Sequence, residues 1–241
     1  MLLRKSASAK DERTTMIELY ELCGANPAHL FSPFCWRVRM ALVHKGLSFR
    51  SNPTCFTDKE LIAFSGQSKV PVIRDGDTVV YDSLAIFAYL DSQYPEKPLL
   101  GDAVASARAK AIDALCTSVL RGGLLKMVLL RVLQACDPKD HAYFRSTREA
   151  FFSDTLENVD NPEQGQALLE AAWPVLAAVL KTQPYFDGDE PAGADYLVFG
   201  HFMWAYTLGI APWQDNAPVN DWFNRLLNIY EAQQGTVVRT A

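Results

Sequence analysis

The first hundred residues of the chain contain short apolar segments whose spacing switches between two periods. Strict alternation of apolar and polar positions predicts strands, and recurrence every three or four positions predicts helices. Along the chain these segments predict a strand at 17–20, a helix at 33–45, a strand at 47–50, a helix at 58–64, strands at 70–73 and 78–81, and a helix at 83–94.

A hairpin signal lies between the last two of these strands. Asp75, Gly76 and Asp77 separate them, and an Asp-Gly pair between two strands favours a tight turn, so these strands are expected to be antiparallel. The resulting order β-α-β-α-β-β-α is that of the thioredoxin fold, an α/β arrangement in which a hairpin extends a partly parallel sheet. We therefore predict a thioredoxin-like domain at 16–95, followed by a linker at 96–102.

Strand patterns disappear after the linker. Apolar positions recur at helical spacing in the segments 104–135, 143–156, 166–181, 195–208 and 220–232. We predict an all-helical domain, a helical bundle, at 103–241, with a frayed tail after Gly235.

Charge and hydropathy exclude several classes of protein. The 241 residues carry a formal net charge of −5 without a basic stripe, so we expect no nucleic-acid partner. The most apolar long stretch, 124–133, is interrupted by Lys126 and Arg131, whereas crossing a bilayer takes roughly 20 apolar residues. We therefore expect no membrane span.

The first residues and the cysteines bear on location. Residues 1–15 lack the apolar centre of a secretory signal, and Asp11 and Glu12 argue against an organelle transit peptide. We expect a disordered tail there, with Met16 as an alternative start. The cysteines are odd in number and have neither the spacing of a zinc site nor the density of a disulfide scaffold, so we expect reduced thiols, no metal site and a cytoplasmic location. They are Cys23, Cys35, Cys55, Cys116 and Cys136.

Ser32 and Pro33 stand where the first helix begins. A capping serine before a proline is a common, purely structural helix start. The same place also stabilises an anion, because unpaired N–H groups give a helix start partial positive charge. A hydroxyl donor at such a place lowers a thiol pKa from about 8.5, and two units correspond to about 2.7 kcal/mol. Ser32 is therefore our candidate catalytic residue, acting as a donor to a thiolate.

Cys35 lies three residues after Ser32, where a redox pair would have its second sulfur. Because serine replaces the first sulfur, a dithiol cycle is excluded at this motif. Two interpretations remain for Cys35. It is either a buried small apolar residue, which we favour, or a secondary reactive thiol.

Val70 and Pro71 begin the third predicted strand. Proline cannot donate a hydrogen bond to a sheet, and in this fold it typically follows a cis bond. A cis bond would let the backbone of Val70 pair with an extended peptide ligand, whereas the alternative is an ordinary trans turn. Lys69 either meets a ligand carboxylate or is a solvated surface lysine.

Asp82 and Ser83 begin the third helix. The helix start and the Ser83 hydroxyl suit a carboxylate, and the Asp82 side chain suits an ammonium group, so together they match an amino-acid head group. Without a neighbouring site, Asp-Ser at a helix start is ordinary capping.

These three pairs, in a thioredoxin-like domain that precedes a helical one, resemble the cytosolic glutathione transferase superfamily over residues 16–235. The segments 31–42, 44–47 and 66–72 are similar to the bacterial β-etherase-like and related fungal serine-type subgroup. The resemblance implies glutathione as cosubstrate, a homodimer and a role in detoxification.

The resemblance also assigns roles to residues. Ser32 would assist the glutathione sulfur, Val70 at the Val70-Pro71 bond would bind its cysteinyl backbone, and Asp82 with Ser83 would hold its γ-glutamyl end. Family members carry Ser or Thr three residues before an aspartate that begins a late helix. Ala192 stands three residues before Asp195 here, so we expect a broken capping box that costs about 1 kcal/mol.

The second substrate is expected to be a small hydrophobic electrophile in the crevice between the domains. Phe34 is expected to wall this crevice, with Trp36 and the segment 121–131 as further candidates. We interpret Trp204 and Tyr206 as core residues, and His201 as a core or surface histidine rather than a catalyst.

Three functions compete. The first is transfer of glutathione to an electrophilic carbon, with aryl-ether cleavage as one version. The second uses Cys35 as the nucleophile in deglutathionylation or disulfide reduction. The third is a non-catalytic carrier of apolar ligands. The complete head-group constellation favours the first.

Overall fold

A mixed four-stranded sheet forms the centre of the first half of the chain. The computed structural model describes residues 16–240, so the tail expected at 1–15 lies outside the described residues. The strands are β1 (Ile17–Leu22), β2 (Phe49–Thr54), β3 (Val72–Asp75) and β4 (Thr78–Tyr81), in the order β2-β1-β3-β4. β1 and β2 are parallel, and β3 is antiparallel to β1 and β4. The thioredoxin-like prediction is confirmed.

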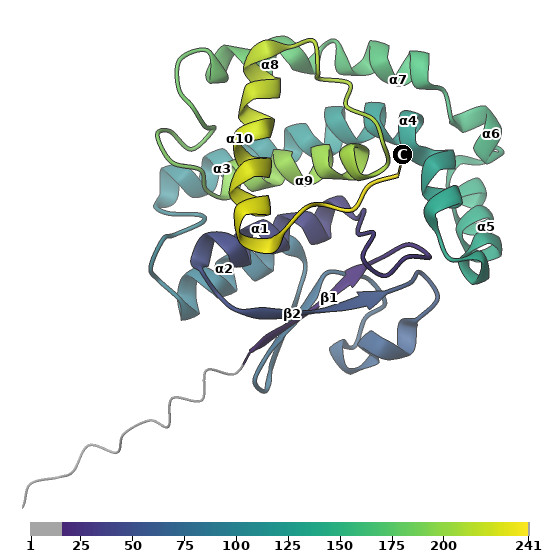
Figure 1. Cartoon of the computed structure of the whole chain (residues 1–241), viewed down its shortest axis with the longest axis horizontal. Helices are drawn as coiled ribbons and strands as arrows, with labels where there is room; N and C mark the ends of the chain where they lie inside the picture. Colours follow the sequence, from purple (N-terminus) through teal and green to yellow (C-terminus); the bar gives the residue numbers. More distant parts are fainter. Residues whose placement is uncertain (1–15, 241) are drawn as a thin grey trace, which may run out of the picture.

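Helices connect these strands, and two of the helices face the second half of the chain (Figure 1). The helices are α1 (Pro33–Lys45), the 3-10 helix η1 (Lys59–Ser65) and α2 (Ser83–Gln93). Figure 1 shows α1 and α2 between the sheet and the helical region above it. Gly46 ends α1 with a φ of 68°, a left-handed conformation that glycine adopts without a steric cost.

The remainder of the described chain is helical, as expected. Its helices are α3 (Ala103–Leu115), the π-helix η2 (Cys116–Leu120), α4 (Arg121–Ala135), the 3-10 helix η3 (Pro138–Asp140), α5 (His141–Phe152), α6 (Leu156–Val159), α7 (Pro162–Leu169), α8 (Ala172–Leu180), α9 (Gly193–Thr207) and α10 (Ala217–Gln234). α9 is buried along most of its length because it packs against α1 on one side and against α3, α4 and α10 on the others.

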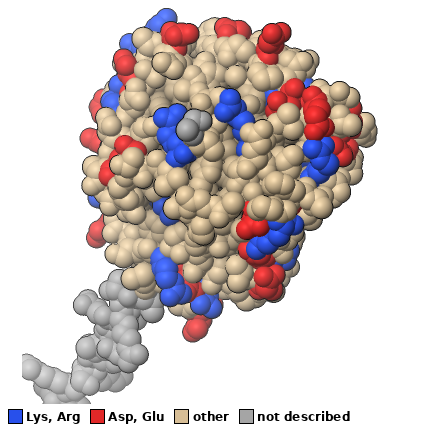
Figure 2. Space-filling view, turned by 45° about the vertical axis from the view of Figure 1, so that its right-hand side comes forward, with Lys and Arg blue, Asp and Glu red and all other residues tan. Residues whose placement is uncertain are grey.

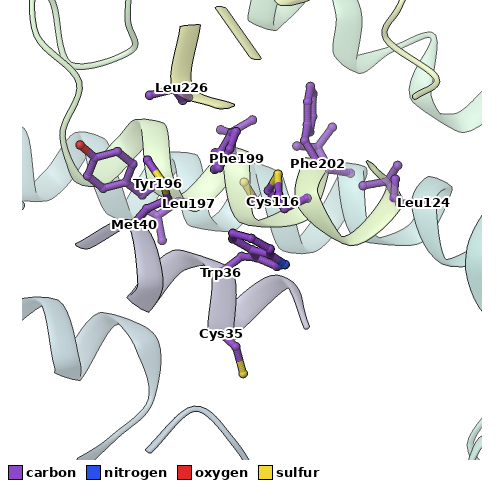
Figure 3. Close-up of a cluster of buried hydrophobic side chains, with 14 of the residues drawn as sticks. Cys35, Trp36, Met40, Cys116, Leu124, Tyr196, Leu197, Phe199, Phe202 and Leu226 are labelled. Carbon is purple, nitrogen blue, oxygen red and sulfur yellow. The ribbon is translucent and has the colours of Figure 1, made fainter. Parts of the chain in front are cut away.

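One continuous apolar core joins the two halves. Phe202 of α9 stacks on Trp213 with ring centroids 4.2 Å apart, and further aromatic rings surround this pair. Figure 3 shows Trp36 of α1 pointing toward α9, whereas Cys35 points to the opposite side of α1. Consecutive side chains of α1 therefore point toward different halves of the molecule.

Several element boundaries differ from the sequence prediction, among them those of β2 and of the helix expected at 166–181. β2 begins at Phe49 and continues to Thr54, through Pro53. Proline is compatible with this position because β2 lies at the edge of the sheet, where its missing N–H is not needed. The single helix expected at 166–181 is divided into α7 and α8.

The expectation that the chain frays after Gly235 is wrong. Val237 is buried, and the Thr240 N–H donates to the Thr207 carbonyl at 2.9 Å. Arg239 donates to the Tyr206 carbonyl and lies over the Tyr206 ring. Figure 1 shows this final segment crossing from the end of α10 toward α4.

The surface carries charges of both signs. Figure 2 shows Lys and Arg side chains interspersed with Asp and Glu over the visible face. Within residues 16–240, no helix is long and apolar enough to cross a membrane.

Candidate functional site

A cavity of about 350 Å³ opens between the thioredoxin-like domain and the helices. One wall comes from the start of α1, the end of β2 with its following loop, and the segment before β3. The other comes from α4, α5 and α9. Its lining residues include Ser32, Pro33, Phe34, Cys55, Phe56, Lys59, Lys69, Val70, Arg121, Leu125, Leu129, Val132, Phe144, Arg148 and Trp204.

Ser32 is both the cap of α1 and part of this cavity wall. Its backbone is extended, and its Oγ accepts a hydrogen bond from the Cys35 N–H at 3.3 Å. That bond uses an acceptor position of the hydroxyl and leaves its proton free to donate. The structural and the catalytic interpretation of Ser32 are therefore compatible with each other.

Cys35 lies outside the cavity wall. It is buried, and its Sγ accepts a bond from the Leu22 N–H at 3.5 Å. Burial, together with the charge of Glu21, raises the pKa of Cys35 to about 12. These observations favour the buried interpretation of Cys35 over the reactive one.

The segment before β3 brings Lys69 and Val70 to the cavity. The Val70-Pro71 peptide bond is cis, as expected. Val70 is half-buried and Lys69 is exposed, and both line the cavity, whereas Pro71 is buried just behind them.

Asp82 and Ser83 lie beside this segment rather than on the cavity wall itself. Val72 pairs with Tyr81, so the residues that follow Tyr81 lie next to Pro71. The Asp82 carboxylate accepts bonds from the N–H groups of Leu84 and Ala85, and its backbone has a φ of 70°. Asp82 thus caps α2, whose first residue is Ser83, and both residues adjoin the segment that lines the cavity.

Arg37 of α1 connects Ser83 to the helical domain. Its buried guanidinium donates to the Ser83 hydroxyl at 3.4 Å and lies 2.8 Å from the Asp113 carboxylate. It also contacts the His201 Nδ1 at 3.3 Å. Burial and the charge of Arg37 lower the pKa of His201 to about 3, so His201 is a neutral core residue.

The charged lining of the cavity is entirely positive. Lys59, Lys69, Arg121 and Arg148 line it, and among residues 16–240 no Asp or Glu side chain does. Burial lowers the pKa of Arg148, whose guanidinium carbon lies 4.7 Å from the centroid of the Phe144 ring. Such a lining favours a ligand that carries negative charge.

The apolar lining partly differs from the sequence prediction. Phe34 lines the cavity, and α4 contributes Leu125 and Leu129. Trp36 does not, because its ring is buried and its Nε1–H donates to the Leu30 carbonyl at 2.8 Å. Trp204, expected in the core, packs against the core and also lines the cavity.

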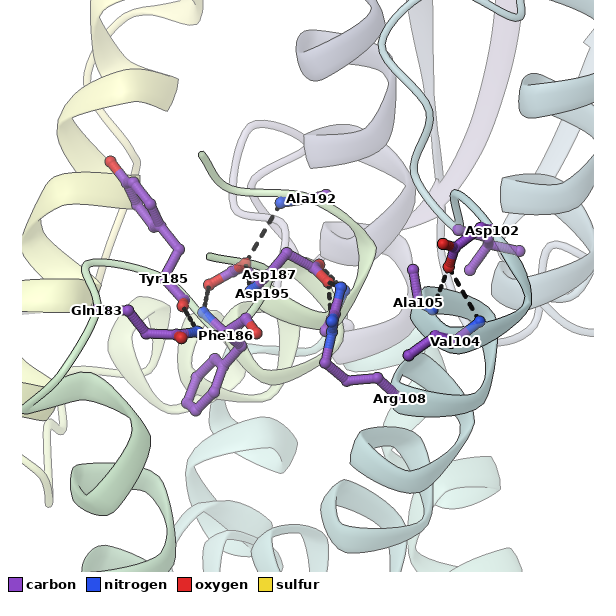
Figure 4. Close-up of polar contacts among 12 residues, drawn as sticks. Asp102, Val104, Ala105, Arg108, Gln183, Tyr185, Phe186, Asp187, Ala192 and Asp195 are labelled. Atoms are coloured by element: carbon purple, nitrogen blue, oxygen red, sulfur yellow. Dashed lines mark hydrogen bonds and ion pairs between the residues drawn. The ribbon is translucent and has the colours of Figure 1, made fainter. Parts of the chain in front are cut away.

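The start of α9 retains one of the two hydrogen bonds of a capping box, from the Ala192 N–H to the Asp195 carboxylate. Figure 4 shows the Asp195 carboxylate near the backbones of Phe186, Asp187 and Ala192. It also accepts the Trp222 Nε1–H at 2.7 Å. Ala192 has no hydroxyl to return a bond, so the reciprocal arm is missing, as expected.

The sequence matches two family models. The glutathione S-transferase N-terminal domain matches residues 28–98, and the glutathione S-transferase C-terminal domain matches residues 107–231. The chain therefore belongs to the glutathione S-transferase family.

Curated relatives and solved structures add detail. Glutathione S-transferase Z2 of Arabidopsis thaliana is 32% identical over 126 residues, which are 49% of this chain and 52% of that protein. A probable maleylacetoacetate isomerase of Caenorhabditis elegans is 32% identical over 113 residues, 45% of this chain and 51% of that protein. The chain spans about half the length of the curated relatives it matches.

Solved fungal structures share the fold over nearly the whole chain. A glutathione transferase from Phanerochaete chrysosporium has a TM-score of 0.79 at 25% identity, covering 90% of this chain and 97% of that one. A glutathione S-transferase of Ceriporiopsis subvermispora in complex with glutathione has a TM-score of 0.78 at 24% identity, covering 94% and 100%.

Proposed function

We propose that this protein is a glutathione transferase in which Ser32 donates a hydrogen bond to the thiolate of glutathione. The observation that carries this proposal is the position of the Ser32 hydroxyl. It stands at the start of α1 and lines a cavity with cationic and apolar walls. The helix start and the hydroxyl both favour the ionised sulfur.

The remaining residues suit the rest of glutathione. The Val70 backbone would pair with the cysteinyl unit, and Lys69 would meet a carboxylate. Asp82 and Ser83 would hold the γ-glutamyl head group beside Pro71. In this arrangement Arg37 fixes the Ser83 hydroxyl through its hydrogen bond.

The reaction is attack of the glutathione sulfur on an electrophilic carbon. A new carbon–sulfur bond forms, and the leaving group departs with its electron pair. The wall of Leu125, Leu129 and Trp204 supports a hydrophobic electrophile. Aryl ethers are the class we favour, because Arg121 and Arg148 would stabilise a departing phenolate.

Separate observations support the proposed subgroup, the cytoplasmic location and the homodimer. The segments similar to the β-etherase-like serine-type subgroup and the fungal structural neighbours support that subgroup. Free cysteines support a reducing cytoplasm. Exposed Tyr81 and Val104 support a homodimer, which a sedimentation mass of 26.9 kDa would contradict.

Calorimetric titration with reduced glutathione tests the proposal on a matched pair of variants. Asp82 and Asp102 each cap a helix through one carboxylate oxygen that accepts two backbone N–H groups. Only Asp82 adjoins the cavity. Asp82→Ala is expected to weaken glutathione binding at least about tenfold, or about 1.4 kcal/mol, while Asp102→Ala binds like the wild type.

Two other outcomes would contradict the role of Asp82 or the transferase proposal. Equal loss in both variants would assign the effect to helix capping and remove the head-group role of Asp82. Absence of binding to the wild-type protein would contradict the transferase proposal and favour the non-catalytic carrier.

A further inference from the structure

Two thiols meet where the parallel strands β1 and β2 end. Leu22 pairs with Thr54 in the last step of the register, and the following residues are Cys23 and Cys55. The Cys23 N–H donates to the Thr54 carbonyl at 3.2 Å, which continues the pairing. The two Sγ atoms lie 3.8 Å apart. Neighbouring strands are separated by about 4.8 Å, which falls within the Cα range that a disulfide requires.

The two sulfurs differ in access. Cys55 is half-buried and lines the cavity that contains Ser32. Cys23 is 2% exposed and lies behind Cys55, away from the cavity wall. One thiol is thus open to a molecule bound in the cavity, and the other is open only to its neighbour.

We propose that Cys55 and Cys23 form a dithiol site that exchanges with glutathione disulfide, Cys55 as the attacking thiol and Cys23 as the resolving thiol. This inference rests on the proposed function, because the exchange requires one glutathionyl half of the disulfide to bind in the cavity. The pair is separate from the Ser32 motif, where the sequence excludes a dithiol cycle.

The exchange balances in two steps. The Cys55 thiolate attacks one sulfur of glutathione disulfide, whose S–S bond breaks, and the first glutathione leaves and takes up a proton. The Cys23 thiolate then attacks the Cys55 sulfur, which forms the Cys23–Cys55 bond and releases the second glutathione. Two electrons pass from the protein dithiol to glutathione disulfide, and an excess of reduced glutathione reverses both steps.

The environment of Cys23 and Cys55 determines the rate of the exchange. Burial raises the pKa of Cys23 and of Cys55, and the nearby Asp58 carboxylate acts in the same direction on both. Only a small fraction of either thiol is ionised near neutral pH, so the exchange is slow and accelerates about tenfold per pH unit. The disulfide itself is uncharged and suits the buried position.

Cys116 provides an internal control. Burial raises the pKa of Cys35, Cys116 and Cys136 to about 12 in each case, and none of them lines the cavity. Figure 3 shows Cys35 and Cys116 at separate places in the packed core. Cys116→Ala therefore removes one buried thiol without touching the proposed pair.

Peptide mapping of the full chain in glutathione redox buffers tests the proposal. Free thiols are alkylated, and the fraction of the Cys23–Cys55 linked peptide is measured by mass spectrometry. We expect this fraction to rise as the ratio of squared reduced glutathione to glutathione disulfide falls. Cys23→Ser should stop at a mixed disulfide on Cys55, Cys55→Ser should lose both products, and Cys116→Ala should match the wild type.

Binding of reduced glutathione, measured separately, distinguishes this inference from the proposed function. If glutathione binds but no linked peptide forms, or if the mixed disulfide forms on another cysteine, the dithiol site is wrong and the transferase proposal stands. If the linked peptide forms with a small symmetrical disulfide but glutathione does not bind, the thiol pair stands and the glutathione cavity is wrong.

Discussion

The hydroxyl of Ser32 can both accept and donate hydrogen bonds, and the helix cap uses it as an acceptor. Its oxygen accepts the Cys35 N–H and so satisfies one unpaired donor at the start of α1. Its proton is not needed for this cap. A glutathione sulfur in the cavity would receive that proton as a hydrogen bond and would lie near the positive end of the helix.

Ser32→Ala is expected to change the pH dependence of transfer to a chlorodinitrobenzene. With Ser32, the thiol pKa is depressed and the sulfur is ionised near neutral pH. Without it, the pKa returns toward about 8.5, and kcat/KM falls about 10- to 100-fold near pH 6.5. The deficit should shrink as pH rises above about 8.5, where both proteins carry the thiolate. Steady-state rates across this range measure the effect.

Thr155→Ala is the matched control for that experiment. Thr155 caps α6 by accepting the Asn158 N–H at 3.3 Å, the same spacing and distance as the Ser32 cap. Both variants should lose about 1 kcal/mol of cap stability, but only Ser32→Ala should lose rate. A deficit in Ser32→Ala that stays constant with pH would assign Ser32 to capping alone.

The sequence predicts those site residues whose position depends on their neighbours along the chain. Ser32 and Asp82 were found because a cap and its helix adjoin in sequence. Arg148 and Cys55 were missed as cavity residues, because what places them there is the packing of α5 against the loop after β2. No local pattern around either residue differs from that of an ordinary helix or loop.

One carboxylate holds the loop that follows β2. Asp140, buried before α5, accepts the Phe56 N–H at 2.7 Å and the Thr57 N–H at 3.0 Å with its two oxygens. The Thr57 hydroxyl donates to it as well. Because Cys55 and Phe56 line the cavity, this contact between the domains fixes part of the cavity wall.

Asp140→Asn is expected to lower the free energy of unfolding by about 1–3 kcal/mol, because an amide presents one oxygen and leaves its NH₂ facing a backbone donor. Urea unfolding measures the change. Asp137→Asn in the same segment is the control, since Asp137 caps Lys139 and asparagine caps equally well. Equal stabilities of these two variants would show that the loop does not depend on Asp140.

Element boundaries were predictable where a strong local signal marked them. Gly46 ends α1, and Gly76 with Asp77 forms the turn between β3 and β4, because a left-handed residue or a tight turn is encoded locally. The end of β3 itself was predicted two residues too early, since Asp75 still pairs with Thr78. β2 was misplaced because its polar half, 51–54, lacks alternation. Its strand conformation comes from pairing with β1, which the pattern of residues 51–54 does not reveal.

At the scale of the whole molecule, the site depends on how closely α1 approaches α9. Gly200 of α9 lies directly against α1. A side chain added there would meet the Pro33 carbonyl and, at 2.8 Å, the Cγ of Arg37. The fold thus brings the helical domain against the first turn of α1, the turn that Ser32 caps and in which the thiolate would be stabilised.

Gly200→Ala is therefore expected to destabilise the protein by about 1–3 kcal/mol and to weaken glutathione binding, because α9 must move away from the start of α1. Gly122→Ala is the matched control. Gly122 lies in α4 with nothing within 4 Å of an added Cβ, so alanine should stabilise it by about 0.5–1 kcal/mol through its helix propensity. Urea unfolding and glutathione calorimetry on both variants separate the effects. If Gly200→Ala lost stability but bound glutathione unchanged, the packing of α9 would support the fold without positioning the site.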